Sequence, residues 1–149
     1  MVINESLPKN QIASMIPSHC VISVPDIEAS ISWYKEMFRF TVLSSKFDPF
    51  WKAKIAFIGH GNFKLKLFEV DQATVLPDER RIPNLDIRTH GTKHVAYAVK
   101  DINTLMFDLK TKGVDVAMDV FPMQGNLVAF IRDNAGNLIE LIERNAAST

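Results

Sequence analysis

Two of the four histidines, His19 and His94, begin similar segments of the chain. Imidazole changes its charge near neutral pH and can move a proton or bind a transition metal, although an isolated strand histidine is more often structural. Here the two segments share His, Val, Asp and Ile at a common offset of 75 positions (94 − 19). The repeat therefore predicts that His19 and His94 occupy equivalent places in the fold.

Each histidine segment runs on into a helical pattern. Apolar residues recur at steps of three and four from Ile27 to Phe38 and from Ile102 to Leu109. Asp26 and Asp101 stand directly before these patterns, where a carboxylate can cap the free amides of a first turn. Three strand-like segments follow each helix. They are residues 40–44, 54–58 and 63–70 in the first copy and 114–118, 126–132 and 138–143 in the second.

With 149 residues, the chain is long enough for one domain built from two βαβββ copies. The stretch between the copies holds Pro77, Pro83 and Gly91 and is expected to be a linker. The expected divisions are an N-terminal leader (1–16), a single domain (17–144) and a tail (145–149). Within the domain, module one covers 17–70, the linker 71–92 and module two 93–144.

The composition favours a small-molecule partner inside the cell. Lys plus Arg and Asp plus Glu both number 17, so no overall positive field would attract nucleic acid or a membrane surface. The single cysteine, Cys20, excludes an intramolecular disulfide and fits a reducing compartment. It lies in an apolar run and is expected to be buried. No apolar stretch approaches the ~20 residues that span a bilayer, so a cytoplasmic location is expected.

The chain resembles the vicinal oxygen chelate superfamily, which includes glyoxalase I, methylmalonyl-CoA epimerase, extradiol dioxygenases and the fosfomycin and bleomycin resistance proteins. The resemblance covers about residues 17–144. It is carried by His19 with residues 24–27 and 33–34, by residues 89–96 with 99–101, and by residues 132–141. It implies an α+β fold in which two βαβββ modules form paired, cup-shaped mixed β-sheets with the helices outside.

The resemblance also implies a ligand set. In metal-using members, the ligands come from the first and last strands of each module and converge inside the cup. By that pattern His19, His94 and Glu140 would bind one divalent metal ion (Zn, Ni, Co, Mn or Fe). Imidazole and carboxylate suit these metals, and three ligands leave positions open for a substrate.

Lys66 departs from the family pattern. Similar proteins often carry a glutamate ligand at this place, and a protonated lysine cannot be a ligand. If Lys66 faces the cup, it leaves a three-ligand site or pairs with Glu140 in place of the metal. A register shift that turned Glu69 inward would instead restore four ligands. Lys66 and Glu140 stand in like places before a leucine, which favours Lys66 inward.

The function implied by the resemblance is that of a metal-dependent lyase or isomerase of the glyoxalase or epimerase type. It would act on a small carbonyl-containing substrate through an enediolate, with Glu140, Lys66 and Glu69 as candidate catalytic residues. The alternatives are an Fe(II) extradiol-type dioxygenase and a metal-free small-molecule-binding protein of the resistance type. A homodimer is expected.

The substrate is expected to differ from that of glyoxalase I. Those enzymes usually place an arginine on the first strand to hold a glutathione carboxylate, and this chain has Ser23 there. A glutathione hemithioacetal is therefore not the favoured substrate. The candidate substrate-binding residues are Arg88, His90, Trp51 and Phe121.

Overall fold

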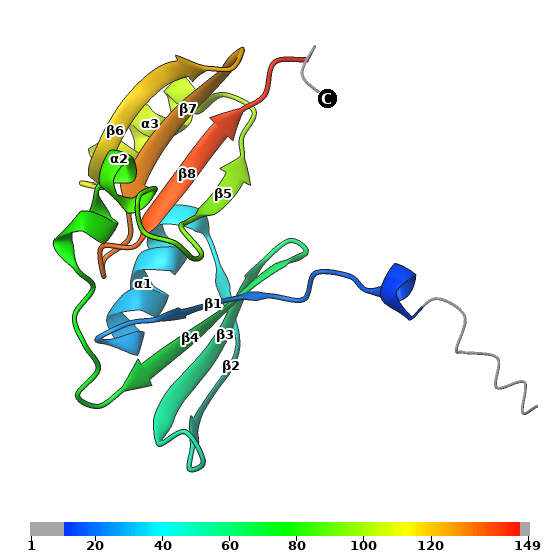
Figure 1. The fold of residues 1–149 in the computed structure, drawn as a ribbon, viewed down its shortest axis with the longest axis vertical. Helices are drawn as coiled ribbons and strands as arrows, with labels where there is room; N and C mark the ends of the chain where they lie inside the picture. The colour runs from blue at the N-terminus through cyan, green and yellow to red at the C-terminus, as the bar shows by residue number, and fades with distance from the viewer. Residues whose placement is uncertain (1–10, 147–149) are drawn as a thin grey trace, which may run out of the picture.

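A computed structural model of the chain describes residues 11–146 as two four-stranded mixed sheets, each with a helix (Figure 1). The first sheet has the order β1-β4-β3-β2, and the second has the order β5-β8-β7-β6. Their strands are β1 Cys20–Ser23, β2 Thr41–Asp48, β3 Ala53–His60 and β4 Phe63–Val70, then β5 Val95–Ala98, β6 Asp115–Met123, β7 Asn126–Arg132 and β8 Leu138–Glu143.

In each sheet the first strand runs parallel to the last strand, and the other pairs are antiparallel. This arrangement confirms the α+β fold of two βαβββ modules. Residues 1–10 of the expected leader and 147–149 of the expected tail lie outside the described residues.

The helices α1 Ile27–Phe38 and α3 Ile102–Thr111 begin where the sequence predicts. Asp26 accepts a hydrogen bond from the Ala29 amide and Asp101 accepts one from the Thr104 amide, both at 3.0 Å. These bonds satisfy amides that have no partner within the helix.

A glutamate from the last strand of each module also closes the start of its helix. Glu69 accepts a hydrogen bond from the Ile27 amide, and Glu143 accepts one from the Ile102 amide, both at 2.8 Å. Glu69 also pairs with Lys54 at 2.9 Å. The Ile27 amide and then the Lys54 ammonium lower the pKa of Glu69. The repeat therefore extends to the contact between strand and helix.

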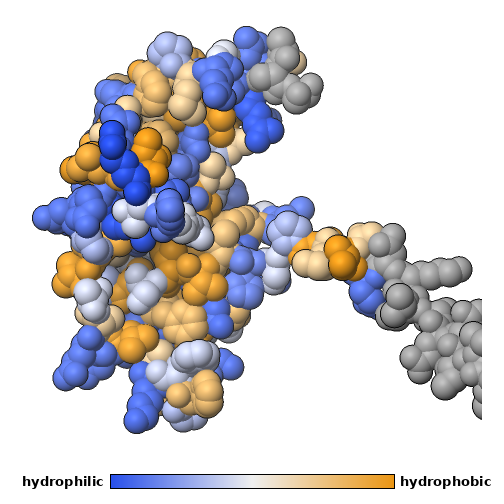
Figure 2. Space-filling view, in the orientation of Figure 1, coloured by the Kyte–Doolittle hydropathy of each residue, from blue (hydrophilic) through white to orange (hydrophobic). Residues whose placement is uncertain are grey.

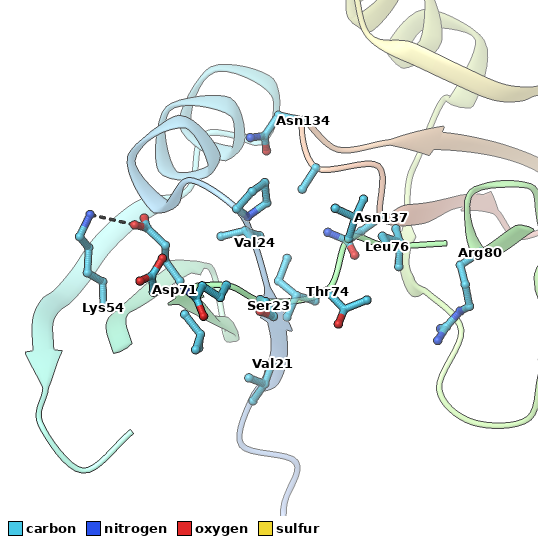
Figure 3. A pocket seen from close by; sticks show the side chains of 18 of the residues that line it. Val21, Ser23, Val24, Lys54, Asp71, Thr74, Leu76, Arg80, Asn134 and Asn137 are labelled. Atoms are coloured by element: carbon cyan, nitrogen blue, oxygen red, sulfur yellow. Dashed lines mark hydrogen bonds and ion pairs between the residues drawn. The ribbon is translucent and has the colours of Figure 1, made fainter. Parts of the chain in front are cut away.

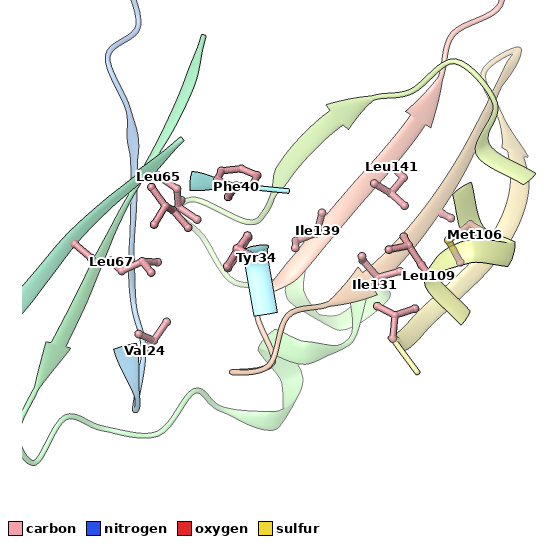
Figure 4. Close-up of a cluster of buried hydrophobic side chains, with 14 of the residues drawn as sticks. Val24, Tyr34, Phe40, Leu65, Leu67, Met106, Leu109, Ile131, Ile139 and Leu141 are labelled. Atoms are coloured by element: carbon pink, nitrogen blue, oxygen red, sulfur yellow. The ribbon is translucent and has the colours of Figure 1, made fainter. Parts of the chain in front are cut away.

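The core lies between the helices and the sheet faces that they cover, as Figure 4 shows for residues from both modules. Tyr34 of α1 crosses to module two, where its hydroxyl donates a buried hydrogen bond of 2.9 Å to Asp133. Burial, followed by the nearby Asp133 carboxylate, raises the pKa of Tyr34. The ring of Tyr97 contacts Phe40 and Phe63 of module one. These contacts join the two modules through a shared core.

The expected linker contains two short helices, η2 Asp78–Arg81 and α2 Pro83–Asp86. Asp86 is only 1% exposed and forms ion pairs with Arg80 at 2.7 Å and with Lys93 at 3.2 Å. The charges in this stretch therefore hold it against the start of module two.

Corresponding turns of the two modules differ in their surroundings. Gly61 and Gly136 both have positive φ, of 56° and 87°. A Cβ atom on Gly61 would meet open space, whereas one on Gly136 would collide with the guanidinium of Arg81. That guanidinium donates a hydrogen bond of 3.3 Å to Ala135, so it packs on the turn itself.

The segment before β1 leaves the body of the protein, and Figure 2 shows apolar side chains along it. Ile12, Met15 and Ile16 are 75 to 85% exposed. Cys20 is also exposed, so the expectation of burial is wrong. It is the first residue of an edge strand, where the sheet offers a neighbour on one side only. No helix in residues 11–146 is long and apolar enough to cross a bilayer.

Candidate active site

The sheet face that points away from the helix carries the main candidate residues in both modules. Leu65 and Leu67 of β4 are buried in the core, so Lys66 between them points to the opposite face. Ile139 and Leu141 of β8 are likewise buried on either side of Glu140. Lys66 and Glu140 therefore occupy equivalent positions, as the sequence predicts.

In module two, a histidine and a carboxylate meet on this face. His94 directly precedes β5, and its Nε2 lies 3.0 Å from Oε2 of Glu140. The side chains are 24% and 13% exposed. Phe130, which pairs with Glu140 across the β7–β8 ladder, meets the His94 ring edge-on at a centroid distance of 5.2 Å. The phenylalanine thus supports both members of the pair.

Module one repeats this layout with a lysine in place of the carboxylate. His19 directly precedes β1, and its ring meets Phe57 edge-on at 5.1 Å. Its Nδ1 lies 2.9 Å from the Ser18 hydroxyl. Lys66 pairs with Phe57 across the ladder, and its Nζ lies 5.4 Å from the Phe57 centroid and 4.8 Å from that of Phe68. Cation–π contacts therefore hold the ammonium in place.

Glu69 lies on the other side of β4 from Lys66. Its carboxylate is bonded to the Ile27 amide and to Lys54 at the start of α1. The register shift that would turn Glu69 toward His19 is therefore not the observed arrangement. The observed register instead places Lys66 on the face that carries His19.

The structure brings together two of the three predicted metal ligands. Within residues 11–146, no three side chains of His, Cys, Asp or Glu form a group that could hold a metal ion. His94 and Glu140 converge, but His19 stands on the other sheet. By donor type the converging pair suits a divalent transition metal. Within one protomer, however, the predicted set is incomplete.

The predicted substrate-binding residues are dispersed. Trp51, in the β2–β3 turn, is 61% exposed and meets the ring of Phe68 at 6.4 Å. Phe121 is half-buried on β6. Arg88 and His90 are exposed in the connection from α2 to β5. Among the described residues, neither side chain bonds to another predicted site residue.

The hollows in the described part of the chain include two near the modules. The larger one, about 1000 Å³, lies between the linker, the end of β1 and the turn after β7, with the Lys54–Glu69 pair on its wall (Figure 3). It does not include His19, His94 or Glu140. An open hollow of about 350 Å³ does include His19, and it is lined by Ser18, His19, Leu43, Ser44, Phe57 and Lys64.

Phe57 is a site residue that the sequence argument does not single out. Its place in β3 corresponds to that of Phe130 in β7, since both pair with the variable residue of the last strand, Lys66 or Glu140. Aligning the two copies strand by strand would have paired these phenylalanines.

The chain belongs to the Glyoxalase/Bleomycin resistance protein/Dioxygenase superfamily, whose family model matches residues 16–141. This match confirms the resemblance stated from the sequence.

Relatives with an assigned activity are named lactoylglutathione lyases. One from Arabidopsis thaliana is 30% identical over 128 residues, which cover 85% of this chain and 43% of the relative. The chain thus spans less than half the length of this plant relative. One from Haemophilus influenzae is 25% identical over 135 residues, which cover 88% of this chain and 94% of the relative.

Solved structures share the fold. A glyoxalase family protein from Enterococcus faecalis superposes with a TM-score of 0.73 at 23% identity, covering 88% of this chain and 99% of the other. The trypanothione-dependent glyoxalase I of Leishmania major gives a TM-score of 0.67 at 26% identity, with 87% of each chain covered. The likeness to the lyase relatives supports a glyoxalase-type enzyme at the level of the family.

Proposed function

We propose that this protein is a glyoxalase-type lyase or isomerase that acts on a small carbonyl-containing substrate through an enediolate. The observation that carries the proposal is the His94–Glu140 pair at 3.0 Å, with His19 at the equivalent place of the other module. Relatives named lactoylglutathione lyase support the reaction class. The balanced charge and single cysteine support a small-molecule partner and a cytoplasmic location.

His94 and Glu140 would hold a divalent metal ion from module two, and His19 is the third ligand that we propose. Such an ion, when bound, polarises a substrate carbonyl as a Lewis acid. Because His19 stands on the other sheet, we propose a homodimer in which His19 of one protomer faces His94 and Glu140 of a second copy. Each dimer would then contain two such sites.

The side chains suggest how a proton would be handled. The Glu140 carboxylate lies on the sheet face that points away from the helix, which we call the open face. There it can accept a proton from a carbon next to the substrate carbonyl. Lys66 would place a positive charge near an anionic group of the substrate. Glu69 is engaged at the start of α1 and has no part in this proposal.

Subunit complementation tests the shared site. The substrates are the hemithioacetal of methylglyoxal with glutathione and a glutathione-free dicarbonyl, phenylglyoxal. We expect His19→Ala and Glu140→Ala each to lose most activity and most bound metal. Mixing the two variants with subunit exchange should restore about a quarter of the wild-type sites, because half of the dimers are mixed and each has one intact site. Exchanged mixtures that stay inactive would contradict the shared site.

One observation favours a second candidate function. Lys66 stands where the corresponding residue of module two is a carboxylate, and an ion pair between Lys66 and Glu140 of a facing module would replace the metal. The protein would then be a metal-free binding protein of the resistance type. Elemental analysis of protein purified without chelator separates the two. About one metal ion per protomer supports the enzyme, and none supports the binding protein.

A further inference from the structure

The open face of the first sheet is positively charged. Ladder pairing puts Lys46, Lys64 and Lys66 on the face that carries His19. Among the described residues, none of the three lysines has an ion-pair partner. The register also places one acid, Asp48, on this face at the end of β2. Its carboxylate accepts hydrogen bonds from the backbone amides of Phe50 and Trp51 in the following turn. The face therefore presents cations without matching anions.

Aromatic rings surround the most enclosed of these cations. Lys66 is half-buried, and its ammonium lies over Phe57 and Phe68. Trp51 stands edge-on to Phe68 and leaves 61% of its own surface exposed. A ligand that carries both a ring and a negative charge could therefore contact these aromatic side chains and the ammonium together.

A space of suitable size adjoins these groups. The open hollow of about 350 Å³ is bounded by Phe57 and Lys64 as well as His19. Lys66 is not part of its lining and adjoins it through Phe57. A volume in this range is typical of small-ligand sites. Ser23, which pairs with Phe68, adds no cation to this face. The positive charge of the face therefore comes from β2 and β4.

We infer that the open face of module one binds an aromatic carboxylate, with the ring against Phe57 and Phe68 and the carboxylate at Lys66. This inference rests on the proposed function, for which it names the substrate class: an aromatic carbonyl compound that carries a carboxylate. A half-buried ammonium without an anionic partner is the group that such a ligand would neutralise.

Calorimetric titration with two matched probes tests the inference without any turnover. The probes are 2-naphthoate and 2-naphthamide, which share the ring and differ in charge. The protein titrated is the full chain freed of metal, with Lys66→Met as the test variant. Lys54→Met is the matched control, because Lys54 lies in the same sheet and pairs with Glu69 on the helix side.

We expect the wild-type chain to bind 2-naphthoate at least about tenfold more tightly than 2-naphthamide, as charge-assisted hydrogen bonds allow. Lys66→Met should reduce the naphthoate affinity to that of naphthamide and leave naphthamide binding intact, which also shows that the variant is folded. Lys54→Met should change neither. Phe68→Leu should weaken both probes, because it removes a ring and leaves the charge.

Equal wild-type affinity for the two probes would overturn the inference, as would equal losses in Lys66→Met and Lys54→Met. Failure of the proposed function looks different. If the wild-type chain showed no lyase or isomerase activity, the proposed function would be wrong. Normal binding of 2-naphthoate by Glu140→Ala in that case would still support the binding site.

Discussion

The two modules place the same kinds of residue on their open faces and differ at one decisive position. In module two, Glu140 meets His94 at 3.0 Å. In module one, the equivalent Lys66 rests on two phenylalanine rings and leaves His19 with the Ser18 hydroxyl. The repeat thus places corresponding side chains alike, and the residue of the last strand is an ammonium in one module and a carboxylate in the other.

The faces also differ in how far they are covered. Val128, Leu138 and Phe130 on the open side of module two are at most 7% exposed. On the same side of module one, Ile55 is 4% exposed, but Val21 of the edge strand is 49% exposed and Phe57, the counterpart of Phe130, is half-buried. Module two therefore offers a protected carboxylate–imidazole pair, whereas module one offers an open surface with rings and charge. In the proposed enzyme, module one would orient a ligand and the His94–Glu140 pair of module two would act on it.

The largest expected effect comes from removing the difference between the modules. Lys66→Glu should give module one the same histidine–carboxylate pair as module two. In the proposed dimer this adds a fourth ligand, so affinity for Co²⁺ should rise by at least about tenfold, and the preference for 2-naphthoate should disappear. Titration followed by the visible absorption of bound Co²⁺ measures the first effect.

Lys64→Glu is the control for that substitution, since it makes the same charge change two residues earlier on the same face. It should leave the Co²⁺ affinity within about twofold of the wild-type value. Residue 64 pairs with Gly59 and not with Phe57, so its carboxylate would not occupy the position that corresponds to Glu140. Similar gains in both variants would mean that general charge, and not the repeated position, determines metal binding.

An intermediate effect is expected at the glycines of the corresponding turns. Gly61→Ala should reduce the free energy of unfolding by about 1 kcal/mol, because alanine disfavours positive φ. Gly136→Ala should cost roughly 2–4 kcal/mol, because it also displaces the Arg81 guanidinium. Urea denaturation measures both values. In an Arg81→Ala background, the cost of Gly136→Ala should fall to that of Gly61→Ala; an unchanged cost would locate the strain elsewhere.

The smallest effect concerns the two glutamates that close the helices. The lowered pKa of Glu69 means that its charge stabilises the fold above the ordinary carboxyl pKa and that this stabilisation is lost as the pH falls through the lowered value. Glu69→Gln should therefore cost roughly 0.5 kcal/mol near neutral pH and nothing in strong acid.

Glu143→Gln provides the comparison, because Glu143 binds the Ile102 amide and has no ion pair among the described residues. Unfolding free energies measured from pH 2 to pH 7 should show a steeper acid loss for the wild type than for Glu69→Gln. Parallel curves would contradict the assigned role of the Glu69 charge.

The fold could be predicted from the sequence because its rules are local and occur twice. Asp26 and Asp101 cap helices, and buried leucines alternate with Lys66 along β4, and both features depend on near neighbours along the chain. The burial of Cys20 could not be judged in this way. Its exposure depends on the position of β1 at the edge of the sheet, which is a property of the whole fold.

The candidate site was less accessible to sequence reasoning. The spacing of His19 and His94 shows that they are equivalent, but equivalent places in two modules need not be close in space. The Tyr34–Asp133 hydrogen bond that joins the modules links residues 99 positions apart, and no sequence pattern predicts this contact. The burial of Asp86 among cations in the linker also depends on three-dimensional contacts.

The last strand of each module uses its two sides for separate purposes. Three residues after Lys66 or Glu140, a glutamate on the opposite side is anchored to the first amide of the helix. A slip of the strand by one residue would release that anchor, so the anchor opposes slippage. The residue at the binding position can therefore be exchanged, even for one of opposite charge, while the strand stays aligned.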